Sequence, residues 1–170
     1  MPIARSKREP RPVVKLTRTV RFSSAHRYWR PEWPAERNQA TFGSNTGLHG
    51  HNYLVEVTAS GVVDAETGFS VDLMALDRAL EIEVGQKLGS RDLSEGVEGL
   101  ADKIPTTENV AVLVWERLAA ALAGAMVLER VRVYESAELF VDYEGKREKR
   151  RADTRTTASR AARTPRRRRP

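Results

Sequence analysis

The stretch HGHNYLVEVTASG, residues 49–61, joins a histidine pair to the pattern of a half-buried strand. After the histidines apolar and polar side chains alternate, with Val55 and Val57 two residues apart. A period of two places such residues on one face of a strand. His49 and His51 have the same spacing, so both imidazoles fall on one face as well. We therefore expect a strand that begins with the two histidines and continues with residues that face the core.

The residues upstream repeat this pattern and lead to the third histidine of the chain. Apolar residues two or four positions apart indicate a strand; they are Val14, Leu16, Val20 and Phe22. This strand ends at His26, and adjacent antiparallel strands lie about 4.8 Å apart. The three imidazoles could then converge on one ion, and three histidines without a fourth protein ligand are typical of an open catalytic zinc site. Hydrogen-bonded structural histidines are the competing interpretation, which the pattern alone leaves open.

Downstream, two amphipathic helices are expected. Residues 64–68 read as a turn and 69–72 as a short strand after it. Asp72 can cap a helix over 73–88, whose apolar residues follow helical spacing. A loop over about 89–104 precedes a second helix, capped by Thr106.

Two further strands, about 128–135 and 138–144, close the pattern. The order of two strands, two helices and two strands predicts an α+β domain. In it an antiparallel four-stranded sheet carries both helices on one face.

Charge divides the 170 residues into a domain and two extensions. Residues 1–12 and 146–170 are basic and nearly free of large apolar side chains, so we expect disordered arms. The domain, 13–145, is acidic. No apolar run approaches the roughly 18 residues of a membrane helix. The absence of cysteine excludes disulfides and thiolate chemistry, and we expect a cytoplasmic protein without a secretory signal.

Five blocks in one order resemble the 6-pyruvoyltetrahydropterin synthase and 6-carboxytetrahydropterin synthase family. They are FSSAH (22–26), LHGHNY (48–53), TG (67–68) followed by VDL (71–73), PTTENVA (105–111) with Trp115, and YE (134–135) with Tyr143. The resemblance covers about 14–145. It implies the T-fold, in which subunits join their sheets into a barrel, usually as a hexamer of two trimers with active sites between subunits.

The same resemblance implies a zinc-dependent lyase. The zinc ligands would be His26, His49 and His51, and the substrate would be 7,8-dihydroneopterin triphosphate. One branch of the family forms 6-pyruvoyltetrahydropterin. The other forms 6-carboxytetrahydropterin and acetaldehyde, on the way to queuosine-type tRNA bases. We expect the 6-carboxy branch, with the 6-pyruvoyl branch as the alternative.

Four further residues are expected to contact the substrate. Glu135 aligns with the family glutamate that grips the pterin ring, because a carboxylate can accept two parallel N–H bonds. It would serve as an anchor or as a proton relay. Thr106 and Thr107 would touch the pterin from a neighbouring subunit, although helix capping explains them equally well. Arg27 is expected to meet the triphosphate because of its charge and its position beside His26.

The catalytic unit of the family is missing. The family uses a cysteine shortly before His-Gly-His as its base, and here that position falls at Asn45 or nearer Gly43. Its Asp-His pair after the first helix is also absent, since residues 88–93 read LGSRDL. The substitute base would be a zinc-activated water, Asp92 or Glu95. A different pterin or purine-like substrate, and pterin binding without turnover, are the alternatives.

The arginine run 166–169 raises one function of another class. Basic arms make salt-sensitive contacts to nucleic-acid phosphates. No aromatic residue is interleaved for base stacking. A solvated tail is therefore the favoured interpretation, and nucleic acid is the alternative partner.

Overall fold

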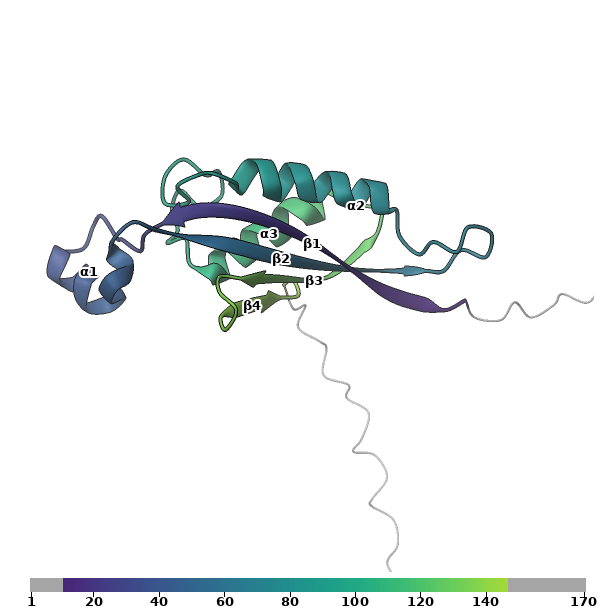
Figure 1. Ribbon diagram of the computed structural model, residues 1–170, viewed down its shortest axis with the longest axis horizontal. Coiled ribbons are helices and arrows are strands. Elements are labelled where there is room, and N and C mark those ends of the chain that lie inside the picture. The colour runs from purple at the N-terminus through teal and green to yellow at the C-terminus, as the bar shows by residue number, and fades with distance from the viewer. Residues whose placement is uncertain (1–10, 147–170) are drawn as a thin grey trace, which may run out of the picture.

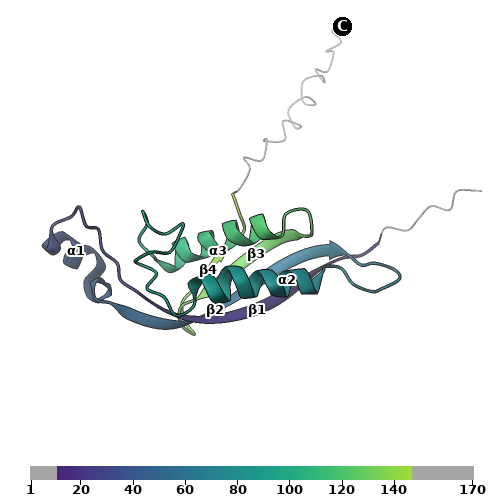
Figure 2. The same cartoon turned by 90° about the horizontal axis from the view of Figure 1, so that it is seen from above.

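The computed structural model describes residues 11–146, and their core is one antiparallel sheet covered by helices on a single face. The strands, in sheet order, are β1 (Val13–His26), β2 (His49–Val62), β3 (Val127–Tyr134) and β4 (Phe140–Tyr143). The helices α2 (Leu73–Leu80) and α3 (Thr107–Ala121) pack on the sheet, as Figures 1 and 2 show. The expected α+β class is therefore confirmed. The expected arms, 1–12 and 146–170, lie almost wholly outside the described residues.

The register of β1 and β2 explains why the alternation seen in the sequence forms a core. The two strands pair along their full length, from Val13 opposite Val62 to His26 opposite His49. Tyr53, at 1% exposure, packs with the buried valines of β2 against the helices. The opposite face of the sheet carries mostly polar side chains, with the exposed Phe140 among them. No helix in the described part of the chain is long and apolar enough to cross a membrane.

The helix expected over 73–88 forms, with one irregularity. Asp72 caps α2, its Oδ1 accepting from the Ala75 N–H at 3.0 Å. The helix then widens into a π-helical segment, Glu81–Gln86, before its last turn. Segments of this type often occur at functional sites. Here the segment precedes the loop that begins after Leu88. This loop runs along the edge of β1, to which it is hydrogen-bonded.

The short strand expected at 69–72 is wrong. The turn at 64–68 is present, with the Asp64 N–H donating to the Phe69 carbonyl at 2.8 Å. After it the chain crosses closely over β2 without pairing as a strand. A Cβ added to Gly61 would lie 1.7 Å from the Ser70 carbonyl oxygen. Only glycine permits this approach, so residues 70–72 serve as the crossing into α2.

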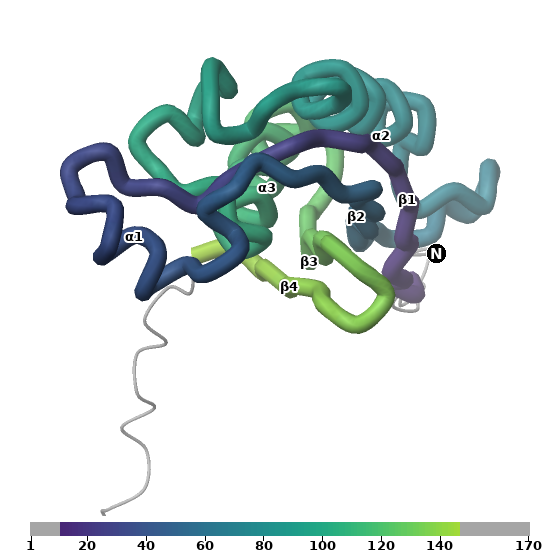
Figure 3. Tube along the Cα trace, turned by 60° about the vertical axis from the view of Figure 1, so that its left-hand side comes forward, coloured from purple at the N-terminus to yellow at the C-terminus, as the bar shows by residue number. Residues whose placement is uncertain are grey.

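A helix that the sequence patterns did not indicate, α1 (Ala35–Phe42), stands away from the sheet. Trp33 stacks on Phe42 with ring centroids 5.8 Å apart. The one buried residue of α1 is Asn38. Its side chain accepts a hydrogen bond from the Arg30 N–H at 2.8 Å and donates one to the Arg30 carbonyl at 3.0 Å. Figure 3 shows α1 and the loop between α2 and α3 near the end of the sheet where β1 ends.

The last two strands differ from the expected bounds: β3 begins and ends one residue earlier, and β4 is shorter. They run over 127–134 and 140–143 rather than 128–135 and 138–144. The Glu135 N–H donates to the Leu139 carbonyl at 3.0 Å, which closes the connecting turn at that point. Glu135 thus stands just beyond β3, at the end of the sheet where the histidines lie.

Candidate functional site

The three histidines meet at one end of the sheet. His26 is the last residue of β1 and pairs with His49, the first residue of β2, while His51 follows two positions later on the same face. Ring centroids are 4.6 Å apart for His26 and His49, 5.0 Å for His26 and His51, and 5.1 Å for His49 and His51. One nitrogen from each ring lies within 4.8 Å of the others. The convergence expected from the strand register is present.

The hydrogen bonds of these rings fit a metal site. The Nδ1 atoms of His26 and His49 lie 2.8 Å from the carbonyls of Pro105 and Gly47. A carbonyl can only accept, so Nδ1 carries the proton and Nε2 keeps a free lone pair. Among the described residues, the buried Nε2 atoms of His26 and His51 have no hydrogen-bond partner. Carbonyls that orient ligating imidazoles are typical of zinc sites, so the residues present fit the ion.

Burial keeps His26 in the form that binds metal. It lowers the pKa of His26, against the smaller raising effects of the Pro105 hydrogen bond and the Glu135 charge. The charges of His49 and His51 lower it further. Metal ligation requires neutral imidazole, so this environment favours binding near neutral pH.

Glu135 joins the sheet end, α3 and the histidines. Its side chain is 12% exposed, and one carboxylate oxygen lies 3.5 Å from His51 Nε2. The other accepts a short hydrogen bond from the hydroxyl of Thr107, a buried residue at the start of α3. Thr106 instead caps α3, with its Oγ1 accepting from the Asn109 N–H at 3.4 Å. Of the two threonines, the structure therefore brings Thr107 to the site within its own chain.

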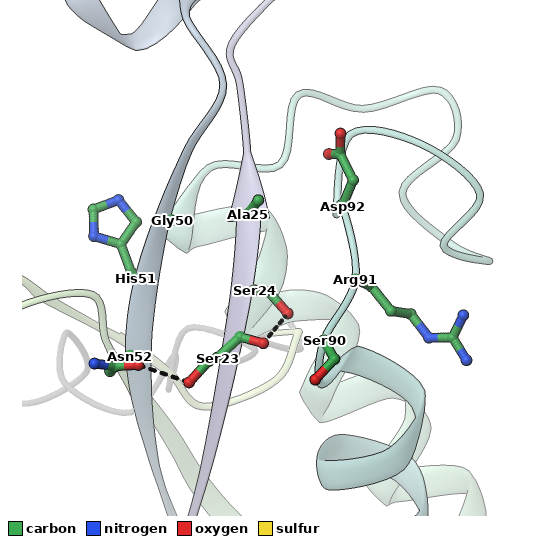
Figure 4. A pocket seen from close by; sticks show the side chains of 9 residues that line it. All are labelled: Ser23, Ser24, Ala25, Gly50, His51, Asn52, Ser90, Arg91 and Asp92. Carbon is green, nitrogen blue, oxygen red and sulfur yellow. Dashed lines mark hydrogen bonds between the residues drawn. The ribbon is translucent and has the colours of Figure 1, made fainter.

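The other expected site residues lie elsewhere. The Arg27 guanidinium is half exposed and lies 3.5 Å from the carboxylate of Glu95. Asp92 caps the turn at Ser94, accepting from its N–H at 2.8 Å. Asp92 and Arg91 line an open depression of about 560 Å³ that also reaches His51. Figure 4 shows the His51 imidazole projecting from β2 away from Arg91 and Asp92.

The structure defines the residues at which the resemblance places the family's catalytic unit. Asn45 lies in the 3₁₀ turn Gly43–Thr46, and its carbonyl accepts from the Tyr28 N–H at 2.7 Å. Ser90, in the place of the family's Asp-His pair, has φ +56° and donates its N–H to the Ser23 carbonyl at 2.7 Å. Neither Asn45 nor Ser90 is a base of useful strength.

Two tyrosines beside the histidines were missed as site residues. The Tyr53 hydroxyl lies 3.3 Å from His26 Nδ1, and the ring of Tyr28 packs edge-on against His26 at 5.1 Å. Burial raises the pKa of both hydroxyls well above the usual range, with a further contribution from the Glu135 charge. Their sequence signal was available, since Tyr53 is two residues after His51 and Tyr28 two after His26.

A four-stranded antiparallel sheet with two helices on one face defines the T-fold, and the three histidines at its end form a cluster that could hold a metal ion. The family model described as 6-pyruvoyl tetrahydropterin synthase matches residues 15–146, and the chain belongs to this family.

Two relatives and one solved structure show the extent of the similarity. The 6-pyruvoyl tetrahydrobiopterin synthase of Drosophila melanogaster is 35% identical over 136 residues, 79% of this chain and 81% of that protein. The Homo sapiens protein of the same name is 37% identical over 134 residues, 78% of this chain and 92% of its own. The structure of Caenorhabditis elegans 6-pyruvoyl tetrahydropterin synthase aligns with a TM-score of 0.75 and 30% identity. It covers 80% of this chain and 98% of its own.

Proposed function

We propose that this protein is a zinc-dependent lyase that acts on 7,8-dihydroneopterin triphosphate. The observation that carries the proposal is the position of Glu135, whose carboxylate stands between Thr107 and His51 beside three convergent imidazoles. A metal site alone would suit many reactions. A nearly buried carboxylate fixed next to that site adds a group that can accept two parallel N–H bonds from an aminopyrimidine edge.

The roles of the residues follow from this placement. Glu135 would hold the pterin ring, and Thr107 would fix the carboxylate in one orientation. His26, His49 and His51 would hold the zinc ion at the side-chain end of the substrate. Zinc, when bound, acts as a Lewis acid that polarises substrate oxygens and makes the neighbouring C–H hydrogens more acidic.

Two products of the proposed reaction are possible. The sequence blocks led to the 6-carboxytetrahydropterin branch, which serves queuosine-type base synthesis. The names of the fly and human relatives favour 6-pyruvoyltetrahydropterin instead. Both reactions begin with the same substrate and differ in whether the side chain is also cleaved. Product analysis therefore decides between them without changing the assignment of the site.

The proton acceptor must differ from that of the family. Within one chain Asp92 and Glu95 lie in the loop that follows Leu88 and passes the end of β1, and Glu95 is paired with Arg27. They stay candidates for a site formed with a second copy. A zinc-activated water is the alternative that needs no further side chain. Pterin binding without turnover is the remaining alternative.

We also propose a homo-oligomer, as the resemblance implies. In the described residues the outer edge of β1 is paired only at its end, where Ala25 forms a bridge with Asp92. Val13 and Val14 on the unpaired part are 66% and 41% exposed. An open edge of this length invites pairing with another strand. A hexamer of two trimers would cover it, and light scattering after size exclusion would measure the assembly.

The experiment for the catalytic proposal compares three proteins, each incubated with the same excess of zinc. Wild type, Glu135→Gln and His49→Ala are incubated with 7,8-dihydroneopterin triphosphate, and the products are identified by mass spectrometry. Wild type should form 6-carboxy- or 6-pyruvoyltetrahydropterin, and both variants should lose most of that activity. Intact substrate with the zinc-loaded wild type would contradict the lyase assignment and leave pterin binding to be measured separately.

A further inference from the structure

Tyr28 occupies a place at the site that none of the roles above uses. It follows β1 by two residues, and its half-buried ring packs edge-on against His26, with ring centroids 5.1 Å apart. The same ring lies 6.4 Å from that of His49 and 6.1 Å from that of Phe42. The Tyr28 ring is therefore in contact with two of the three proposed metal ligands and with one side chain of α1.

A main-chain hydrogen bond also holds Tyr28 in place. Its N–H donates to the Asn45 carbonyl at 2.7 Å, at the position where the family resemblance places the missing cysteine. Tyr28 thus links the end of β1 to the turn before β2. A side chain held from both sides loses little further freedom when it binds a ligand.

The hydroxyl of Tyr28 is free to bind something else. No hydrogen bond to it is formed by the residues that the structure describes. A phenol that is partly buried, next to a metal site and without a protein partner is suited to a ligand oxygen.

We propose that the Tyr28 hydroxyl hydrogen-bonds an oxygen of the hydroxylated side chain of the pterin, and so selects pterins that carry such a side chain. This rests on the proposed function. Glu135 stands on the His51 side of the cluster, whereas Tyr28 stands on the side of His26 and His49. The ring and the side chain of the pterin would then be recognised by different residues, and the phenol needs no proton transfer for its part.

The test uses two ligands that differ only in the side chain. Zinc-loaded wild type and Tyr28→Phe are titrated calorimetrically with neopterin, which has a trihydroxypropyl group, and with unsubstituted pterin. Loss of one neutral hydrogen bond should weaken neopterin binding about 3- to 10-fold. Binding of unsubstituted pterin and the zinc content should stay unchanged. Tyr143→Phe is the matched control, because that ring packs on Trp115 away from the histidines.

The remaining outcomes distinguish a failure of the Tyr28 proposal from a failure of the proposed function. Equal neopterin affinity in wild type and Tyr28→Phe would overturn the role of Tyr28 while the pterin site stands. Equal weakening of both ligands would also overturn it, because the tyrosine would then contact the ring or support the site as a whole. Loss of zinc from Tyr28→Phe would make the residue a metal ligand instead. Failure of the zinc-loaded wild type to bind either pterin would remove the proposed function itself.

Discussion

Replacing Thr107 by valine tests whether this residue acts on the ligand through Glu135. Valine keeps the shape of threonine and removes the hydroxyl that donates to Glu135. Thr107 is 3% exposed and the Glu135 side chain 12%, so water cannot readily replace the lost donor. A hydrogen bond to a charged group contributes about 1.5–3 kcal/mol. The free energy of unfolding should therefore fall by about 1–3 kcal/mol.

Ligand binding should weaken as well, by an amount comparable to the stability change. Without the Thr107 hydroxyl, the described residues leave His51, at 3.5 Å, as the side chain that contacts the carboxylate. Glu135 would then be free to rotate out of the orientation that Thr107 holds. We expect pterin affinity to fall about tenfold, which corresponds to about 1.4 kcal/mol. Calorimetric titration with pterin measures this, and urea denaturation measures the stability.

The neighbouring threonine supplies the control. Thr106→Ala removes the cap of α3, whose hydrogen bond to Asn109 is long at 3.4 Å, and should cost about 0.5–1 kcal/mol of stability. It should leave pterin affinity within twofold of wild type. Unchanged affinity in Thr107→Val, or equal losses in both variants, would refute the reasoning that Thr107 acts on the ligand through Glu135.

Three further predictions concern the metal, α1 and pH. His49→Ala should lower zinc affinity by more than the roughly 10- to 100-fold seen when only an outer partner is lost, and zinc should no longer raise its melting temperature; dialysis with metal analysis and thermal melts check this. Asn38→Ala should raise hydrogen exchange over α1 and destabilise the loop by about 1–3 kcal/mol, because the main-chain groups of Arg30 lose their partners. The hydrogen bonds from Arg132 lower the pKa of Asp142, so this carboxylate contributes stability above its unfolded pKa and loses it as pH falls through the folded value. Asp142→Asn should therefore cost less than about 1 kcal/mol at pH 7, and in urea titrations the difference should shrink as pH falls through the folded pKa of Asp142.

The main elements of the fold could be predicted because they obey simple periods. The alternation in β1 and β2 and the helical spacing after Asp72 describe elements that pack on the core. Helix α1 lacks this signal, since its only buried residue is the polar Asn38. The strand expected at 69–72 was wrong for a related reason. The close approach of Gly61 to Ser70 depends on a tertiary contact that no local pattern records.

The metal ligands could be predicted and the rest of the site only in part. His26 and His49 face each other because strand register carries their spacing into space. The contact between Thr107 and Glu135 joins residues 28 positions apart through the docking of α3, and no spacing rule supplies it. The spacing of Tyr28 from His26 is the same as that of Tyr53 from His51, but Tyr28 lies beyond the end of β1, where a period of two no longer fixes the face. The pairing of Arg27 with Glu95 was likewise beyond what charge and proximity to His26 could predict.

The most direct measurement is release of inorganic triphosphate from 7,8-dihydroneopterin triphosphate by the assembled, zinc-loaded protein. Our account predicts multiple turnovers that stop when zinc is removed and that fall sharply in Glu135→Gln. A protein with one zinc per chain that binds the pterin yet releases no triphosphate would contradict it. The loss of the family's cysteine and Asp-His pair would then have left a binding protein.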